Sequence, residues 1–281
     1  MKNKMKSLLV IALMGCCMYT QGMTVRAENV KEVESNDTME MAQLIEANSE
    51  TAAQAVSGNR PDQYVVNGYT STKDVDWYKV YLSTGTQYVT CNEKGFNFQI
   101  YAPNGNIIMD KTYTKTGLGS TAYAFSADTS GYYYVKVSGI TSSSQKYLLL
   151  VGGPTYSVAY CEVKLDEVIM EDKEDSNLSF DLSCEEKLPN NAVVYTIAME
   201  GVRTTAVNSV AVTNSKINKT VNLTLYLWKK SDLVSMKMPL KSEWKIKFGY
   251  RKDVSFTPSI KLYYAYPVVS KYAEDDLVIT P

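Results

Sequence analysis

The chain has 281 residues, with 29 lysines and arginines, 30 aspartates and glutamates, and no histidine. The near-neutral charge balance leaves no basic excess to neutralise phosphates, which argues against a nucleic acid as the partner. The lack of histidine removes the commonest general base and metal ligand, so imidazole-dependent triads and HExxH zinc chemistry are excluded. Carboxylate-only chemistry survives this exclusion.

The first 27 residues are typical of a secretory signal peptide, with lysines near the start, an apolar stretch from Ser7 to about Tyr19 and a small-residue ending at Ala27. The apolar stretch is shorter than the ~20 residues that cross a bilayer, and no later segment comes closer, so we expect no transmembrane segment. Removing residues 1–27 would leave 25 basic against 30 acidic residues. The sequence therefore predicts a mildly acidic protein that is extracellular or at the cell surface.

An alternative processing site lies within the same segment. Residues 13–16, LMGC, approximate a bacterial lipoprotein site, which would tether the protein through Cys16, although Met14 fits that pattern poorly. After either cleavage Cys91, Cys161 and Cys184 remain, and in an oxidising exterior an odd count leaves at least one thiol unpaired. Cys161 and Cys184 are the better pair for a bridge, if one forms, but the sequence does not establish their geometry.

The sequence after the signal peptide suits two domains of the common size, ~100–150 residues each. The break falls at the Gly-Gly-Pro run of residues 152–154, so we predict domains at residues 28–153 and 154–281. In the first domain, short runs rich in Val, Tyr, Ile and Phe recur between Gly, Asn, Pro and Ser turns, as an antiparallel sandwich requires. The predicted strands are Gln63–Asn67, Asp76–Leu82, Gln87–Asn92, Asn97–Tyr101, Ile107–Asp110, Ala122–Ser126, Tyr132–Ser138 and Tyr147–Val151.

Alternation within these strands predicts their faces. Tyr78, Val80 and Leu82 share one face, which is the better core candidate, and Tyr133 points opposite to Tyr132. A short helix is predicted at Thr38–Ala47. The second domain also has strand patterns and is predicted to be another antiparallel β-sandwich, with strands at Ser157–Leu165, Ala192–Met199, Ser209–Thr213, Thr220–Trp228, Trp244–Arg251 and Ile260–Tyr266. The predicted fold class is therefore all-β.

An acidic stretch, EVESND at residues 32–37, follows the signal peptide closely. Glu32, Glu34 and Asn36 alternate, so in an extended segment their side chains point the same way, and Asp37 can join them where the chain turns. Carboxylates held together repel one another unless a cation lies between them. Calcium takes about 6–8 oxygen ligands at about 2.3–2.6 Å in irregular geometry. The stretch therefore indicates a calcium site.

Helix capping is the alternative for the same residues. Asp37 or its neighbour would cap the helix at Thr38–Ala47, Glu40 would complete a capping box from Asp37, and both glutamates would face solvent. A second acidic pair, Asp74 and Asp76 in KDVDWY, alternates at the start of a predicted strand. This pair either supplies further ligands or belongs to an ordinary polar loop.

The ordered motifs EVESND, DVDWYKVYL, GYYYVKVSG and YLLLV resemble the bacterial pre-peptidase C-terminal domain, a family that includes the collagen-binding modules of clostridial collagenases. The resemblance covers about residues 30–153 and implies a jelly-roll-like sandwich whose leading segment binds calcium in the collagen-binding members. Lys73 stands where those members have another aspartate, so we expect one Ca²⁺ ion rather than two. The ligands that the resemblance implies, with Asp74 as the weaker match, are Glu32, Glu34, Asn36, Asp37, Asp74 and Asp76.

We expect a secreted, non-catalytic binding or adhesion protein with a calcium-stabilised sandwich and an extracellular protein, collagen-like, or a polysaccharide as its ligand. The 22 tyrosines either form a ligand surface or pair across strands inside the sandwiches, and none is assigned to a ligand site. Two alternatives stay open. One is a small secreted hydrolase with two carboxylates in the second domain, because the family's modules usually accompany catalytic partners; the other is an accessory or regulatory partner of a separate secreted protease.

Overall fold

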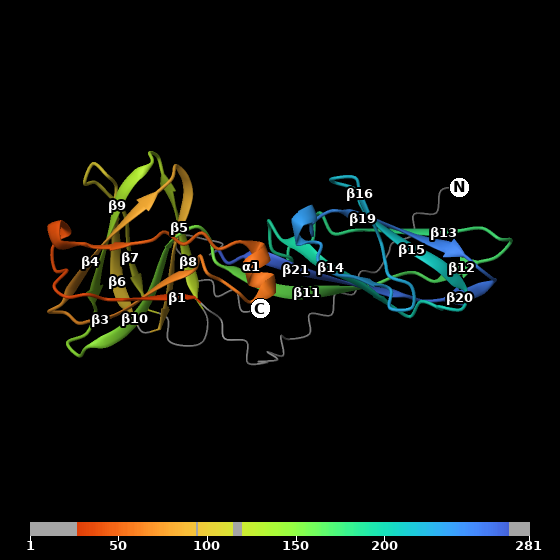
Figure 1. Cartoon of the computed structure of the whole chain (residues 1–281), viewed down its shortest axis with the longest axis horizontal. Coiled ribbons are helices and arrows are strands. Elements are labelled where there is room, and N and C mark those ends of the chain that lie inside the picture. Colours follow the sequence, from red (N-terminus) through yellow and green to blue (C-terminus); the bar gives the residue numbers. More distant parts are fainter. Residues whose placement is uncertain (1–26, 94, 115–119, 270–281) are drawn as a thin grey trace. The chain divides into compact units, whose positions relative to one another are not determined.

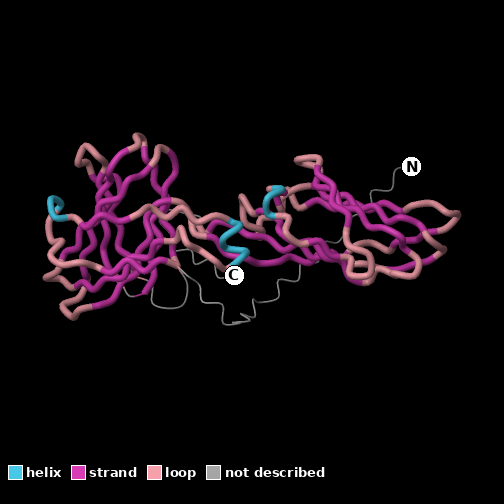
Figure 2. The backbone as a smooth tube through the Cα atoms, viewed as in Figure 1, coloured by secondary structure: helices cyan, strands magenta, loops and turns pink. Residues whose placement is uncertain are grey.

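The computed structural model describes residues 27–93, 95–114 and 120–269, and these residues fold almost entirely as β-structure (Figure 2). The predicted signal peptide, with Cys16, lies outside the described residues apart from Ala27. The chain forms two compact units (Figure 1). The first unit holds the described chain up to Tyr156 and the described residues after Tyr266, and the second is Ser157–Tyr266. In the described parts of the chain, no helix is long and apolar enough to cross a membrane.

The first unit is a sandwich of two five-stranded sheets, with the orders β1-β3-β10-β5-β8 and β2-β4-β9-β6-β7. Neighbouring strands are antiparallel except at one edge of each sheet, where β1 runs parallel to β3 and β2 parallel to β4. All eight strands predicted for this part of the sequence are confirmed, within a few residues at their ends. The strands are β1 (Glu28–Lys31), β2 (Gln43–Ile45), β3 (Tyr64–Thr70), β4 (Val75–Leu82), β5 (Gly85–Glu93), β6 (Phe96–Tyr101), β7 (Ile107–Tyr113), β8 (Thr121–Ala127), β9 (Gly131–Gly139) and β10 (Gln145–Gly152).

The core of the first unit lies between its two sheets, and strand alternation decides which residues enter it. Tyr78, Val80 and Leu82 on β4 are buried, as predicted. On β9, Tyr133 is buried while Tyr132 is 44% exposed, so their predicted opposition is also confirmed. Both sheets contribute aromatic rings to one core cluster, among them Tyr78, Phe96, Phe98, Tyr113, Tyr123, Phe125, Tyr133 and Tyr147.

The helix predicted at Thr38–Ala47 is wrong. In its place are a single 3-10 turn, η1 (Met39–Met41), and the edge strand β2. β2 pairs with β4 and buries Ile45 in the core, so tertiary pairing outweighs the local helical pattern. Thr38 precedes η1 without a side-chain capping bond, so helix capping does not account for the acidic stretch beside it.

The α-helix of the first unit lies further along the chain, at α1 (Ala52–Ser57). It begins at a capping box between Thr51 and Gln54 and ends at Gly58, whose φ of 73° is the left-handed conformation that glycine adopts without strain. Next to this helix, Glu50 is buried and pairs with Arg60 at 3.0 Å.

The second unit contains one sheet of order β11-β21-β14-β17, in which β18 also pairs with β14, one of order β13-β19-β15-β16, and the two-stranded pair β12-β20. Trp244, Ile246 and Phe248 of β19 are buried, and so are Leu262 and Tyr264 of β21. The strands are β11 (Tyr156–Lys164), β12 (Val168–Met170), β13 (Ser176–Asp181), β14 (Val193–Glu200), β15 (Val207–Asn214), β16 (Lys219–Asn222), β17 (Lys229–Lys230), β18 (Met238–Pro239), β19 (Glu243–Tyr250), β20 (Val254–Phe256) and β21 (Ser259–Pro267), with a 3-10 turn η2 (Val234–Met236).

Five of the six strands predicted for the second domain correspond to β11, β14, β15, β19 and β21. The sixth prediction, Thr220–Trp228, is right only at its start, because β16 ends at Asn222 and a turn follows, closed by a bond from the Trp228 N–H to the Thr224 carbonyl. Cys161 and Cys184 are not bridged. Cys161 lies on β11 with its side chain buried, whereas Cys184 lies in an exposed turn after β13. The two thiols therefore do not meet.

Candidate metal centre

The acidic stretch begins where β1 leaves the first sheet. The Glu32 N–H donates to the Asn67 carbonyl at 3.1 Å, which continues the pairing of β1 with β3 by one residue. The Glu32 carboxylate accepts a bond from the Tyr69 N–H at 3.0 Å. Its Oε1 lies 3.4 Å from the Tyr78 hydroxyl and 3.3 Å from the Tyr147 hydroxyl, which are themselves 2.5 Å apart, so one hydroxyl donates to the other and the second donates to Glu32. Backbone pairing, the Tyr69 N–H and one tyrosine hydroxyl therefore fix the position of this carboxylate.

Asp76 comes from the other sheet. It is the second residue of β4 and lies on the inward side with Tyr78. Its side chain is fully buried, and neither carboxylate oxygen makes a hydrogen bond of ordinary geometry among the described residues, although the Glu32 and Tyr147 side chains are near enough to shift its pKa. The N–H of the next residue, Trp77, donates to the Asn36 carbonyl at 2.8 Å. This bond holds the acidic stretch alongside the start of β4.

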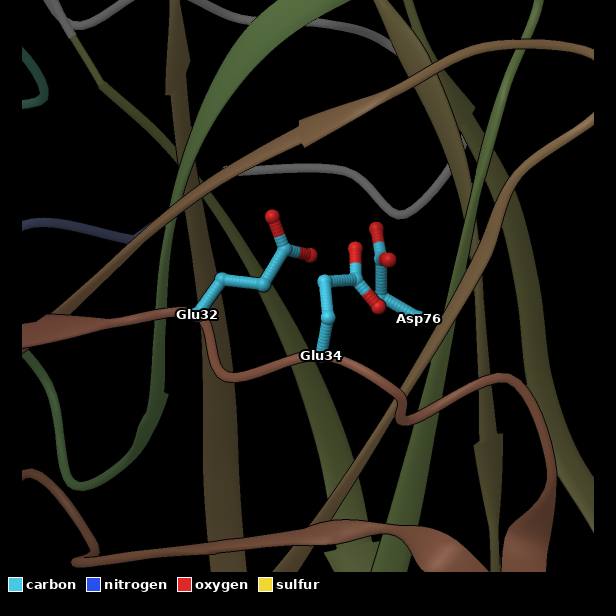
Figure 3. A group of neighbouring side chains, drawn as sticks. All are labelled: Glu32, Glu34 and Asp76. Atoms are coloured by element: carbon cyan, nitrogen blue, oxygen red, sulfur yellow. The ribbon is translucent and has the colours of Figure 1, made fainter.

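The carboxylates of Glu32, Glu34 and Asp76 converge on one space (Figure 3). One oxygen from each lies within 4.8 Å of the others. Figure 3 shows the first two side chains rising from the N-terminal segment toward the third, which comes from β4. The peptide bond between Glu34 and Ser35 is cis.

Asn36 adds a buried amide beside this group. Its side chain is fully buried, and neither polar atom of the amide has a hydrogen-bond partner in the described chain. A buried polar group without a partner costs about 1–3 kcal/mol, so folded proteins rarely leave one without a ligand or water. The Asn36 amide oxygen and both Asp76 oxygens are therefore buried acceptors that suit a cation.

Asp37 and Asp74 are close enough to this group for their charges to shift the pKa values of its carboxyl groups. Burial raises the pKa of Asp74, and the charges on Glu32 and Asp37 raise it further. Burial, followed by the charges on Glu32 and Asp74, likewise raises the pKa of Glu34. Asp37 is exposed and Asp74 is partly exposed, so these two carboxylates lie toward solvent while Asp76 lies inside.

Among these carboxyl groups, Asp76 has the most strongly raised pKa. Burial raises the pKa of its carboxyl to about 9, and the adjacent Glu32 contributes to the rise. In this geometry Asp76 keeps its proton at neutral pH unless a positive charge is brought close to it. A bound cation would reverse that preference, because it favours the ionised form of every neighbouring carboxylate.

Three of the six predicted ligands, Glu32, Glu34 and Asp76, therefore meet, although they come from two segments of the chain. All of them offer oxygen, which suits a hard cation such as Ca²⁺ better than a softer metal. Of the other three, Asn36 is joined through its carbonyl to the Trp77 N–H beside Asp76, and Asp37 and Asp74 act on the group through their charges.

Two tyrosines of this centre were not predicted from the sequence. Tyr78 shares the inward face of Asp76 because it lies two residues further along β4, so strand alternation could have identified it. Tyr147 has no such local signal. It lies opposite Gly68 in the pairing of β10 with β3, and a Cβ at Gly68 would collide with the Tyr147 ring. Because Gly68 has no side chain, the Tyr147 ring can pack over it. The Tyr147 hydroxyl then lies 2.5 Å from the Tyr78 hydroxyl.

The fold and the site together define a two-unit β-sandwich protein with an oxygen-rich acidic centre in its first unit. No protein-family model and no curated protein sequence matches the chain. Among solved structures, a protein from Eubacterium rectale described provisionally as secreted matches with a TM-score of 0.53 and 10% identity, over 86% of this chain and 87% of that one. At this identity the likeness shows the fold alone.

Two further structures are similar at a lower level. The pre-peptidase C-terminal domain of collagenase from Bacillus anthracis gives a TM-score of 0.28 with 18% identity, over 39% of this chain and 93% of that domain. A triple-jelly-roll chain of an archaeal virus gives a TM-score of 0.27 with 12% identity, over 72% of this chain and 58% of that one. At these scores neither structure adds to the argument, and the all-β sandwich class predicted from the sequence is confirmed by the strands and sheets of the chain itself.

Proposed function

We propose that this chain is an exported, non-catalytic binding protein whose first unit is stabilised by one calcium ion. The proposal depends on one observation, the convergence of Glu32, Glu34 and Asp76 beside the buried amide of Asn36, which has no hydrogen-bond partner in the described chain. Asp37 and Asp74 would complete the oxygen ligands from the exposed side. The ion would neutralise carboxylates that otherwise raise one another's pKa.

Calcium would act on the structure rather than on a reaction. Glu32 and Glu34 belong to the N-terminal segment and Asp76 belongs to β4, so one ion would tie the segment to the second sheet of the sandwich. A ligand that binds only the folded state stabilises it by about 2.7 kcal/mol when its free concentration is about 100 times Kd. The N-terminal segment would become more resistant to proteolysis for the same reason.

Export and family relationship are supported by the sequence. The first 27 residues have the pattern of a signal peptide, and attachment through Cys16 is the alternative route to the cell surface. The motifs EVESND and DVDWYKVYL support a relationship to the pre-peptidase C-terminal domain. The ligand of such a protein would be an extracellular protein or a polysaccharide.

The calcium proposal is tested by thermal unfolding of the purified chain with Ca²⁺, with Mg²⁺ and with a chelator. We expect a higher Tm in Ca²⁺ alone. Asp37→Ala should lower the Tm only when Ca²⁺ is present. Glu40→Ala is the matched control, because Glu40 is an exposed acid of the same segment that contributes to none of the raised pKa values in the centre. Equal melting of the unchanged chain in Ca²⁺ and in chelator would remove the proposal.

A carboxylate-dependent hydrolase is the second candidate, favoured by one observation in the second unit. Asp181 and Glu243 are cross-strand partners on β13 and β19, and both line a hollow of about 800 Å³. Glycosidases use two carboxyl groups about 5–10 Å apart. Here, however, Asp181 accepts a bond from the Ser183 N–H at 2.8 Å, and Glu243 pairs with Lys245 at 3.5 Å. New reducing ends released from polysaccharides by the unchanged chain, but not by Asp181→Asn, would favour the hydrolase.

A further inference from the structure

The outer face of the second sheet of the first unit carries aromatic rings and lysines instead of the usual small polar side chains. Tyr81 is 53% exposed and Tyr132 is 44% exposed on this face. Strand alternation makes these residues the opposite face to the core residues of β4 and β9. We call the set the aromatic–lysine face, and its members are Trp77, Lys79 and Tyr81 of β4, Tyr132, Tyr134 and Lys136 of β9, and Tyr101 of β6.

The strand register interleaves the two kinds of side chain. Lys79 lies opposite Tyr134, and Trp77 lies opposite Lys136. The Lys79 ammonium is 4.4 Å from the centre of the Tyr132 ring and 5.7 Å from that of Tyr134. The Lys136 ammonium is 5.8 Å from the centre of the Trp77 ring. Both lysines are therefore held against aromatic rings, within the range of a cation–π contact.

The rings also contact one another in two pairs, of which only Tyr81 and Tyr132 are well exposed, since Trp77 is 9% exposed. Tyr81 and Tyr132 meet edge to face with their centres 5.4 Å apart, and Trp77 and Tyr101 are 5.0 Å apart. Such contacts limit rotamer freedom, so a ligand that stacks on the rings has little ordering entropy to overcome.

The positive charge on this face is not balanced by an ion pair. Neither Lys79 nor Lys136 has a carboxylate within 4.0 Å among the described residues. The second unit offers a contrast, since Lys261, close to a row of three tyrosines, pairs with Glu200 at 2.5 Å and with Glu162 at 3.9 Å. One carboxylate of the same sheet, Asp110 of β7, has its pKa lowered by hydrogen bonds, and it is close enough for the charge on Lys136 to lower that pKa further. With two lysines and this one acid, the face keeps an excess of positive charge that an anionic ligand can balance.

An ordinary solvent-facing sheet of this chain looks different. On the outer face of β13-β19-β15-β16, Lys245 and Lys247 are exposed among Ser179, Thr213 and Thr220. Lys245 and Lys247 pair with acids at 3.5 Å and 2.9 Å. Exposed aromatic area is therefore not shared by every outer face here, and clustered exposed apolar area is the usual sign of a binding surface.

We propose that the aromatic–lysine face binds an acidic polysaccharide. The apolar C–H face of a sugar ring would stack on Tyr81 and Tyr132, as flat aromatic side chains allow. The carboxylate or sulfate groups of the chain would meet the ammonium groups of Lys79 and Lys136, each of which presents three donors. This inference rests on the proposed function as a binding protein, and it names the ligand class and the surface.

The test is binding of the purified chain, in Ca²⁺, to three immobilised polymers: polygalacturonate for carboxylate groups, dextran sulfate for sulfate groups and unmodified dextran as the neutral arm. We expect binding to at least one acidic polymer, weakened by salt, and none to dextran. The variants Tyr81→Ala/Tyr132→Ala and Lys79→Gln/Lys136→Gln should each weaken binding about tenfold or more, and the more weakened of the two acidic polymers identifies the preferred group. Both pairs lie outside the core, and an unchanged Tm would show that the sandwich is intact.

The variant Lys245→Gln/Lys247→Gln is the matched control, because it removes the same charge from the polar outer face of the second unit. Its binding should equal that of the unchanged chain. If Lys79→Gln/Lys136→Gln and Lys245→Gln/Lys247→Gln lost the same amount of binding, the loss would be due to net charge alone. That result would overturn the inference. Binding to collagen without binding to either acidic polymer would also overturn it, while leaving the proposed function as a binding protein intact. The rise of Tm in Ca²⁺ is read separately and should be the same in all these variants.

Discussion

Glu32 and Asp76 place carboxylate oxygens within 4.8 Å of each other, although one residue follows an edge strand of the first sheet and the other lies inside β4 of the second. Without a cation, this approach is stabilised by a hydrogen bond to Glu32 from the Tyr78–Tyr147 pair and by a retained proton on Asp76. With a cation, the same carboxylates would become ligands. Asp76 is protonated in the first state and ionised in the second, and this difference can be measured.

Asp76→Asn should separate these two states. Asparagine keeps the shape of aspartate but removes the buried carboxyl, so in chelator the variant should melt at the same temperature as the unchanged chain or higher. In Ca²⁺ it should melt lower, because a central ligand is lost. The gain in Tm on adding Ca²⁺ should therefore shrink to a small fraction of its original value, as differential scanning calorimetry would show.

Asp128→Asn is the control for that experiment. Asp128 is an exposed acid after β8, distant in sequence from the centre, and its loss should shift the Tm by the same small amount with and without Ca²⁺. If Asp76→Asn kept the full calcium gain, Asp76 would not be a ligand.

The stability of the calcium-free protein should fall as pH rises. The pKa of Asp76 is about 9 in the folded chain against an ordinary value of 3.8, so between these values the unfolded chain has lost a proton that the folded chain retains. Each added pH unit in that window then lowers the free energy of unfolding by up to about 1.4 kcal/mol. The raised pKa values of Glu34 and Asp74 act in the same direction at the acidic end.

Calcium should flatten this pH profile, because it stabilises the ionised carboxylates in the folded state. Urea unfolding from about pH 5 to about pH 8, in chelator and in Ca²⁺, measures both curves. A calcium-free stability that rises with pH over this range would contradict the assignment of a retained proton to Asp76.

The strands of the first unit could be predicted because their alternation is local. The inward positions of Tyr78, Val80 and Leu82 follow from period-two spacing alone, and so does the shared face of Asp76. The acidic stretch was equally visible, because its spacing in an extended segment brings Glu32 and Glu34 to one side.

The parts that were missed depend on contacts between distant segments. β2 replaces the expected helix because Ile45 has a place in the core beside β4, which residues 38–47 do not reveal by themselves. Tyr147 reaches the centre because Gly68, far away in sequence, leaves room for its ring. The lysines of the aromatic–lysine face were visible in the sequence, but their lack of ion pairs required the structure.

The two cysteines of the second unit should differ sharply in reactivity. Burial raises the pKa of the Cys161 thiol to about 12, so it is neither accessible nor ionised at neutral pH. Cys184 is exposed. Iodoacetamide should label Cys184 in the native protein and Cys161 only after unfolding, as peptide mass spectrometry would show. If neither cysteine were labelled in denaturant without a reductant, Cys161 and Cys184 would be joined by a disulfide, in contrast to the structure.

Removing one partner of the buried ion pair of Glu50 and Arg60 should cost far more stability than removing one partner of an exposed pair. The Glu50 side chain is fully buried and lies 3.0 Å from an Arg60 nitrogen. Its other oxygen accepts bonds from the Gln63 side-chain amide at 3.0 Å and the Tyr156 N–H at 3.3 Å. Burial raises the pKa of Glu50, and Arg60 opposes that rise. Arg60→Gln would leave a buried carboxylate without its cation, which should cost on the order of 3 kcal/mol in urea unfolding.

The matched comparison is Lys146→Gln, which removes one partner of the exposed pair with Glu93, 3.7 Å apart. That change should cost less than about 1 kcal/mol. Adding Glu50→Gln to Arg60→Gln should recover part of the lost stability, because the buried charge is removed as well. Acidification should do the same for the Arg60→Gln protein, since Glu50 takes up a proton more readily once its cation is gone. If Arg60→Gln and Lys146→Gln lowered the free energy of unfolding equally, water would be solvating the Glu50 carboxylate in place of Arg60.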